Sequence, residues 1–150
     1  MTAFKPRDPD YAARVRDSFG RQTMMATIGA EIVELEPGAC TLSMTHRRDL
    51  CQQHGYLHAG VTTTLADSAA GYAAFSLFPA GSSVLTVEFK INLMAPAAGE
   101  RFLARARVER SGRTLTVVRS EVFAVGQDGV ERPIALMLAT MMCLADTPDA

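Results

Sequence analysis

The chain has 150 residues, of which 48% are hydrophobic, so it is long enough for one domain with a sizeable core. A net charge of −1 and the lack of a basic tract argue against a nucleic acid or an anionic membrane surface as the partner. No apolar run approaches the ~20 residues of a membrane helix, and the first residues lack the apolar centre of a signal peptide. Cys40, Cys51 and Cys143 are odd in number and widely spaced, which excludes a disulfide framework and favours the cytoplasm.

Residues 1–26 are expected to form an N-terminal segment with one short helix. Residues 1–9 are polar and contain prolines, which favours irregular structure. Apolar residues then recur at helical spacing over residues 10–19, and Asp10 stands where an N-cap is expected. The apolar residues of this pattern are Tyr11, Val15 and Phe19.

Residues 27–146 are expected to form a single domain with about six strands and one long helix. The chain has no internal repeats and no alternation of strands with helices, which predicts an α+β fold with a mainly antiparallel sheet. Turn residues separate the strands, among them Pro37-Gly38 and Ser111-Gly112. The expected strands are residues 27–36, 39–46, 84–94, 101–110, 113–125 and 131–144.

Two of these strands predict which residues share a face. Apolar and polar residues alternate over residues 84–94, as in a strand with one buried side. This alternation places on one face Leu85, Val87, Phe89, Ile91 and Leu93. The last strand, residues 131–144, is apolar on both faces, so it is predicted to be covered on both sides, in part by another subunit.

Residues 52–78 organise the chain, because they form a polar loop that opens into one long helix. The loop contains Gly55 and Gly60, and small, helix-compatible residues begin near His58. So many small residues on one helix predict close approach by neighbours on several sides, as when a sheet wraps around it. Asp67 is the one charge in this apolar helix, and burying an unpaired carboxylate is costly, so it is a candidate functional residue.

The same stretch carries a resemblance to a known family. The pattern Q-x-x-G-x-x-H-A-G at residues 52–60, followed by L-A-D at residues 65–67, resembles the PaaI-like hotdog-fold acyl-CoA thioesterases. That family shows G-x-x-H-G-G and then L-x-[DE], with Asn or Gln three residues before the first glycine. The resemblance continues through T-V-E-F-K-I-N at residues 86–92 and covers roughly residues 25–144. The chain departs from the pattern at Ala59, where the family usually has glycine.

The resemblance implies hydrolysis of acyl-CoA thioesters without a cofactor, on a hotdog fold whose sheet wraps around the long helix. Asp67 would act as general base on water, or attack the thioester to form an anhydride, and the sequence does not separate these routes. The family's oxyanion donor is the amide after the histidine, which here belongs to Ala59. Alanine keeps this N–H, and a helix start favours negative charge. The structural alternatives are an ordinary helix start and a solvent-facing aspartate.

Three further residues of the motif are assigned from the resemblance. Gln52 matches the position of the family's Asn or Gln, which hydrogen-bonds the substrate carbonyl or positions a water. His58 would either polarise the thioester or have a structural role at the helix entry. Gly60 would complete the catalytic turn, and Gly55 is assigned to substrate binding.

Two threonines are assigned to the surroundings of the carboxylate and the substrate. Thr86 matches a Ser/Thr position that in the family helps to hold the nucleophilic water. Thr63 is also a candidate substrate-binding residue, because Thr63 and Thr64 lie one turn before Asp67 and could hydrogen-bond its carboxylate. The alternative is an ordinary structural position, since a threonine in a strand needs no functional explanation.

The spacing of Ala59 and Asp67 predicts that two chains share each site. Eight residues on one helix separate the two backbones by about 12 Å, so one carbonyl cannot touch both groups of the same chain. A homodimer with antiparallel helices solves this, and the resemblance implies such a dimer, often paired into a tetramer. Cations that could meet the phosphates of coenzyme A, or simply form a solvated fringe, are Lys90, Arg110 and Arg113.

Other functions on the same fold stay open. One is a non-catalytic module that binds acyl-CoA or an acyl carrier, and release of free thiol from acyl-CoAs would separate a hydrolase from such a module. A hotdog dehydratase is disfavoured, because those enzymes usually carry a different histidine and carboxylate arrangement. No metal is expected, since the three histidines form neither an HExxH motif nor a cluster with cysteine.

Overall fold

The computed structural model describes residues 4–149 and contains one sheet, one long helix and two short helices. The helices are α1 (Tyr11–Arg21), α2 (Thr23–Ile28) and α3 (Ala59–Phe75), with a 3₁₀ turn, η1, at Arg48–Leu50. The strands are β1 (Ala30–Glu36), β2 (Ala39–Thr45), β3 (Ser83–Leu93), β4 (Arg101–Ser111), β5 (Leu115–Val125) and β6 (Glu131–Leu144). No helix in this described range is long and apolar enough to cross a membrane.

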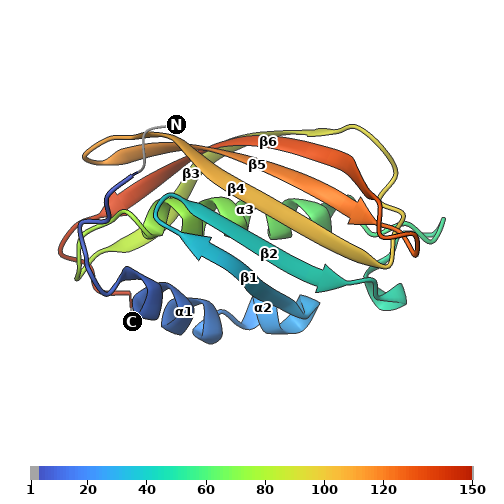
Figure 1. The fold of residues 1–150 in the computed structure, drawn as a ribbon, viewed down its shortest axis with the longest axis horizontal. Coiled ribbons are helices and arrows are strands. Elements are labelled where there is room, and N and C mark those ends of the chain that lie inside the picture. The colour runs from blue at the N-terminus through green and yellow to red at the C-terminus, as the bar shows by residue number, and fades with distance from the viewer. Residues whose placement is uncertain (1–3, 150) are drawn as a thin grey trace.

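The sheet is antiparallel throughout and has the strand order β1-β2-β4-β5-β6-β3. It curves around α3, which contacts all six strands, while α1 and α2 lie beside the β1 edge (Figure 1). The predicted architecture of six strands around one central helix is therefore confirmed. The two edges of the sheet are β1 and β3, and only β1 is covered by helices.

The alanines of α3 explain how the sheet can wrap so closely around it. Ala66, Ala69, Ala70 and Ala73 are all fully buried, and their spacing of three and four residues places them on one face of the helix. Small side chains on this face let the backbone of the curved sheet approach the helix closely. Asp67 lies among them as the charged residue of this helix.

Strand β3 departs from the predicted alternation because it contains a β-bulge at Val87. Thr86 pairs with Met141, but the next paired residue is Glu88, so Val87 is an extra residue in the ladder. Thr86 and Phe89 consequently both face α3, whereas Leu85 lies on the outer face. The prediction that Leu85 and Phe89 share a face is wrong, because one inserted residue reverses the period of two.

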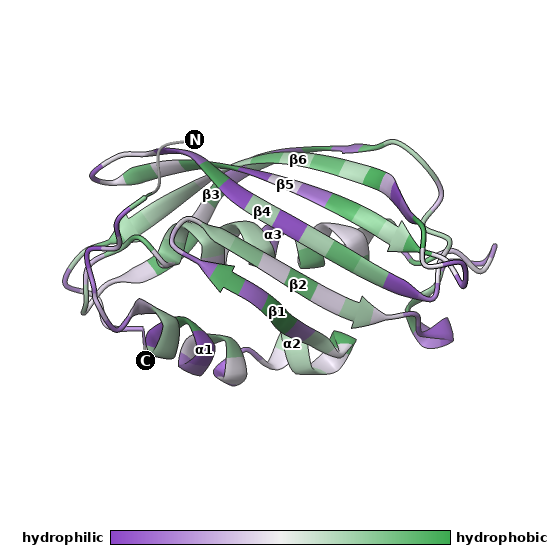
Figure 2. Cartoon of the chain, viewed as in Figure 1, coloured by the Kyte–Doolittle hydropathy of each residue, from purple (hydrophilic) through white to green (hydrophobic). Residues whose placement is uncertain are grey.

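The outer face of β6 is less covered than the sequence predicted. The inner-facing residues Met137 and Met141 are fully buried against α3, but Leu138 on the outer face is 50% exposed. Figure 2 shows hydrophobic residues running along β6 and the adjacent part of β5. One chain thus leaves part of this outer face exposed, and its predicted cover by another subunit stays a prediction.

The start of the domain also differs from the prediction. Thr27 and Ile28 were expected in a strand but belong to α2, and Gly29 follows in the left-handed conformation (φ 70°), which ends the helix and begins β1. Asp10 precedes α1 as expected, but its side chain caps nothing. The Asp8 carboxylate instead accepts a hydrogen bond from the backbone N–H of Asp10.

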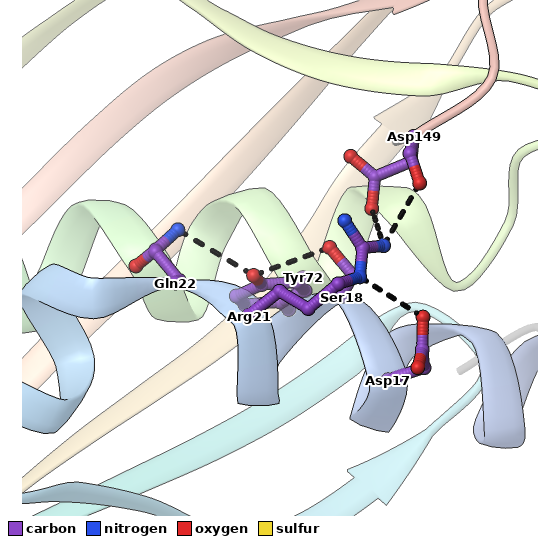
Figure 3. A network of polar contacts seen from close by, with 6 residues as sticks. All are labelled: Asp17, Ser18, Arg21, Gln22, Tyr72 and Asp149. Carbon is purple, nitrogen blue, oxygen red and sulfur yellow. Dashed lines mark hydrogen bonds and ion pairs between the residues drawn. The ribbon is translucent and has the colours of Figure 1, made fainter.

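Polar contacts fix α1 against the middle of α3 (Figure 3). Gln22 donates its side-chain N–H to the hydroxyl of Tyr72, and its carbonyl oxygen accepts from the hydroxyl of Ser68. At the end of α1, Arg21 pairs with Asp149 at 3.0 Å. The N-terminal segment thus packs on the turn of α3 that follows Asp67.

Candidate active site

A cavity of about 360 Å³ lies at the amino end of α3. The loop before α3, the end of β3 with the segment after it, and the start of β6 form its walls. It brings together two of the predicted residues, Gln52 and Ala59. The other lining residues are Tyr56, Leu57, Thr62, Leu93, Ala95, Pro96, Ala97 and Ile134.

The amide of Ala59 is the free donor at this helix start. The amides of Val61 and Thr62 both donate to the carbonyl of His58, and the amide of Gly60 donates to the His58 ring. The amide of Ala59, by contrast, has no partner within residues 4–149. Ala59 lines the cavity at the positive end of the helix dipole, where an unpartnered amide favours an oxygen that develops negative charge.

His58 is the N-cap of α3. Its Nδ1 accepts the N–H of Gly60 at 2.9 Å, so in the neutral ring the proton lies on Nε2. A side chain at position 60 would crowd this ring, since a Cβ there would lie 3.0 Å from Nδ1. Gly60 therefore leaves room for the cap, and its amide is engaged by the His58 ring, so its part in the catalytic turn stays a prediction.

The loop before α3 is held by its own backbone. The amide of Gln52 donates to Tyr56, and the amide of Gly55 donates to Gln52. Gly55 has a positive φ of 85°, which the turn requires, and it does not line the cavity, so its assignment to substrate binding stays a prediction. The side-chain oxygen of Gln52 accepts from the amide of His54, which leaves its NH₂ group for a ligand.

Asp67 is half-buried and hydrogen-bonded by Thr86, whose hydroxyl donates to the carboxylate at 2.9 Å. Burial raises the pKa of the Asp67 carboxyl above its ordinary value, and the bond from Thr86 partly opposes this. The predicted contact from Thr63 and Thr64 is wrong, because both hydroxyls donate to backbone carbonyls of the preceding helical turn, at 2.8 Å.

One chain does not bring Asp67 to the cavity. Asp67 is not among the lining residues, and it lies about 12 Å along α3 from Ala59 at ~1.5 Å per residue. Instead, Asp67 lies beneath the Thr86 end of β3, whereas the cavity lies at the Leu93 end of the same strand. The structure therefore separates the sequence motif into two half-sites on one chain.

Thr62 is a cavity residue that the sequence analysis missed. It stands three residues after Ala59, so it lies on the same side of the helix, and this spacing could have identified it. The candidate phosphate-binding residue Lys90 pairs in register with Leu138, which places it on the outer face, away from Asp67. Arg110 and Arg113 lie at the other end of the sheet, around the β4–β5 turn.

Comparisons with known proteins identify the family of this chain. A model described as the thioesterase superfamily matches residues 54–131. The crystal structure of a thioesterase family protein from Silicibacter pomeroyi has a TM-score of 0.88 and 56% identity, over 90% of this chain and 98% of that chain. The E. coli PaaI protein, from the phenylacetic acid degradation operon, has a TM-score of 0.81 over 94% of this chain and 98% of that chain. Its identity is 22%, so this likeness concerns the fold.

A protein named 1,4-dihydroxy-2-naphthoyl-CoA hydrolase, from Listeria monocytogenes, is 30% identical over 63% of this chain and 76% of its own length. The family model spans more than half of the chain and includes the loop from residue 54 on, α3 and Thr86. The predicted resemblance is thus confirmed, and the chain belongs to the thioesterase superfamily, with a PaaI-like hotdog fold.

Proposed function

We propose that this protein hydrolyses acyl-CoA thioesters, with the amide of Ala59 as oxyanion donor and Asp67 as general base or nucleophile. The observation that carries the proposal is the unpartnered amide of Ala59 on the wall of a largely apolar cavity. A thioester carbonyl bound there gains negative charge as it is attacked, and a fixed N–H at a helix start stabilises that charge. The free NH₂ group of Gln52 supplies a second donor on the same wall.

Asp67 acts in its ionised form in both possible routes. As a base it takes a proton from water, and as a nucleophile it forms an anhydride that water then cleaves. The hydroxyl of Thr86 orients the carboxylate and favours its charged form. Thr86 therefore positions Asp67, in addition to any contact it makes with water.

We infer that the carboxylate at each cavity comes from a second copy of the chain. Strand β3 is an edge strand with large exposed apolar side chains, among them Leu85, Phe89 and Leu93. Such an edge is a template for pairing with another strand. An antiparallel partner strand would satisfy the backbone groups of this edge and cover these side chains.

The positions along β3 favour this pairing. Thr86 marks the Asp67 half-site and Leu93 marks the cavity, and their separation of seven residues corresponds to about 23 Å at ~3.3 Å per residue. If a two-fold axis passes near residues 89–90, the partner's Thr86 lies opposite Leu93. Asp67 of the partner subunit is then carried towards Ala59, and the symmetric site forms at the same time.

The exposed outer face of β6 around Leu138 supports a further pairing of two dimers. Exposed arginines and Lys90 at the rim of the dimer would contact the phosphates of coenzyme A.

Cytoplasmic location, which the three unpaired cysteines favoured, stays a prediction. The absence of a required cofactor stays a prediction as well.

Release of free thiol from a panel of acyl-CoAs, read with a thiol reagent, tests the hydrolysis. We expect turnover by the native protein and at least a ~100-fold lower kcat in folded Asp67→Ala, the scale for losing a general base or nucleophile. Thr140→Val, on the outer face of β6, is a control that should keep full activity. Binding of acyl-CoA without thiol release would instead identify a binding module.

The shared site is tested with two defective variants, Gln52→Ala and Asp67→Ala. When the two are co-refolded in equal amounts, about half of the dimers are mixed. A mixed dimer has one site with both defects and one intact site, so about a quarter of the native activity should return. No recovery, despite proven subunit exchange, would eliminate the shared-site model.

A further inference from the structure

The hydroxyl of Thr86 has two acceptors within reach. Its oxygen lies 2.9 Å from Oδ1 of Asp67 and 3.5 Å from Sδ of Met141. A hydroxyl has a single hydrogen, which can rotate, so Thr86 donates to only one of the two at a time. The stronger acceptor of the moment therefore decides where this hydrogen points.

The contact with Met141 is fixed by the pairing of β3 with β6. Thr86 and Met141 lie directly opposite each other in the two strands, just before the bulge at Val87. The side chain of Met141 is 0% exposed, so its sulfur stays beside Thr86 whether or not the site is open to solvent. A thioether is a weak acceptor, and an ionised carboxylate is a much stronger one.

The protonation state of Asp67 decides between the two acceptors. An ionised carboxylate only accepts hydrogen bonds, so in that state the hydrogen of Thr86 points to Asp67. A protonated carboxyl can itself donate, and the oxygen of Thr86 can accept from it. The hydrogen of Thr86 then needs another acceptor, and among residues 4–149 the sulfur of Met141 lies within reach.

We propose that Met141 is a positioning residue of the active site, because its sulfur accepts the hydrogen bond of Thr86 while Asp67 holds a proton. This proposal rests on the proposed role of Asp67 as general base. Water gives a proton to Asp67 as its oxygen bonds to the thioester carbon, and the same proton passes to the sulfur of coenzyme A when the C–S bond breaks. Thr86 and Asp67 stay hydrogen-bonded throughout, since only the direction of donation changes.

Few other groups bear on the titration of Asp67. Burial and the bond from Thr86 are the two causes that act on its pKa. Tyr72 of α3 and Cys143 of β6 are titratable, but neither acts on this pKa. The charged side chains of β3 lie on the outer face of the sheet and are Glu88 and Lys90. In the proposed dimer, Asp67 would also face His58 of the partner subunit, which is the same in every variant compared below.

Met141→Leu tests the proposal, because it keeps the size of the side chain and removes the acceptor. Loss of the sulfur destabilises the protonated state of Asp67 alone. The pKa of Asp67 and the acid limb of the kcat/KM profile should therefore move to lower pH by about half a pH unit, opposite to the effect of Thr86→Val. In a Thr86→Val background, Met141→Leu should move neither, because the hydroxyl that Met141 serves is absent.

Met137→Leu is the matched control. Met137 lies on the same face of β6 and is equally buried, but it pairs with Ile91 instead of Thr86. It should leave the acid limb in place. The proposal is overturned if Met141→Leu leaves the pKa of Asp67 unchanged, if Met137→Leu moves it as far, or if the effect of Met141→Leu persists without the hydroxyl of Thr86.

An NMR titration of the Asp67 carboxyl separates this proposal from the hydrolysis itself. It reports the pKa in the native protein and in each variant without any turnover, so it tests Met141 even if no thioester is cleaved. Absence of thiol release from every acyl-CoA would refute only the hydrolysis. If the acid limb moves in Met141→Leu while the NMR titration of Asp67 does not, the proposal is wrong, because Met141 would then act on a different group.

Discussion

Replacing Ala59 by proline tests the oxyanion donor with little disturbance of the fold. Proline removes the backbone N–H, and Ala59 is the first residue of α3, where proline is well tolerated. The amide of Ala59 makes no hydrogen bond within the described residues, so the substitution removes no hydrogen bond from the folded protein. The preceding residue, His58, has φ −61° and ψ 139°, which is the extended conformation that a following proline requires.

These features set the expected magnitudes. The free energy of unfolding of Ala59→Pro should change by less than about 1 kcal/mol, since the substitution neither breaks a bond nor strains the backbone. Loss of one oxyanion donor costs about 3–4 kcal/mol of transition-state stabilisation, which corresponds to a 10²- to 10³-fold lower kcat. Activity and stability should therefore separate clearly in this variant.

The assay compares thiol release with denaturant unfolding for Ala59→Pro, Ala59→Gly and the native protein. Ala59→Gly keeps the N–H and should stay active, which controls for the loss of the methyl group. Native turnover in a folded Ala59→Pro protein would refute the assignment of the Ala59 amide as the donor. Equal loss of activity in Ala59→Gly would point to the methyl group instead.

Three further variants probe Asp67 and the dimer edge. Burial raises the pKa of Asp67 in the folded state, so ionisation of this carboxyl lowers the stability of the protein as pH rises. Asp67→Asn should therefore have a higher melting temperature than the native protein at neutral pH and the same melting temperature in strong acid. Equal melting temperatures at neutral pH would contradict this. Thr86→Val removes the bond that favours the ionised form, so the pKa of Asp67 should rise and the acid limb of the kcat/KM profile should move to higher pH, while Thr86→Ser should leave it in place. Phe89→Lys places a charge on the exposed edge of β3 and should give inactive monomers by sedimentation, whereas Leu138→Lys on the outer face should keep the dimer; an active monomer would refute the shared site.

Local patterns in the sequence were sufficient to predict the general fold. The alanine-rich helix after the loop, the turn residues and the number of strands all follow from propensity and periodicity. The position of Ala59 at the helix start followed as well, because small, helix-compatible residues begin near His58. These features depend on residues close together in the chain, so the sequence contains the information needed.

Features that depend on distant parts of the chain were not predictable in this way. The exposure of Leu138 depends on which elements lie over the sheet, and the contact of Thr86 with Met141 depends on how β3 pairs with β6. The partner of Asp67 was also misjudged. Thr63 and Thr64 are close in sequence, but Thr86, 19 residues away, makes the bond because the bulge turns it towards α3.

The bulge at Val87 makes the length of β3 more important than the identity of the residue that creates it. The side chain of Val87 is 49% exposed, so many amino acids should be accepted there at small cost. Deleting the residue would restore a regular ladder and turn one end of the strand over, so that either Thr86 leaves Asp67 or Leu93 leaves the cavity wall. Position 87 should thus tolerate almost every substitution, whereas its deletion should disrupt the site. This combination is more typical of a loop whose length is fixed by the two elements it connects.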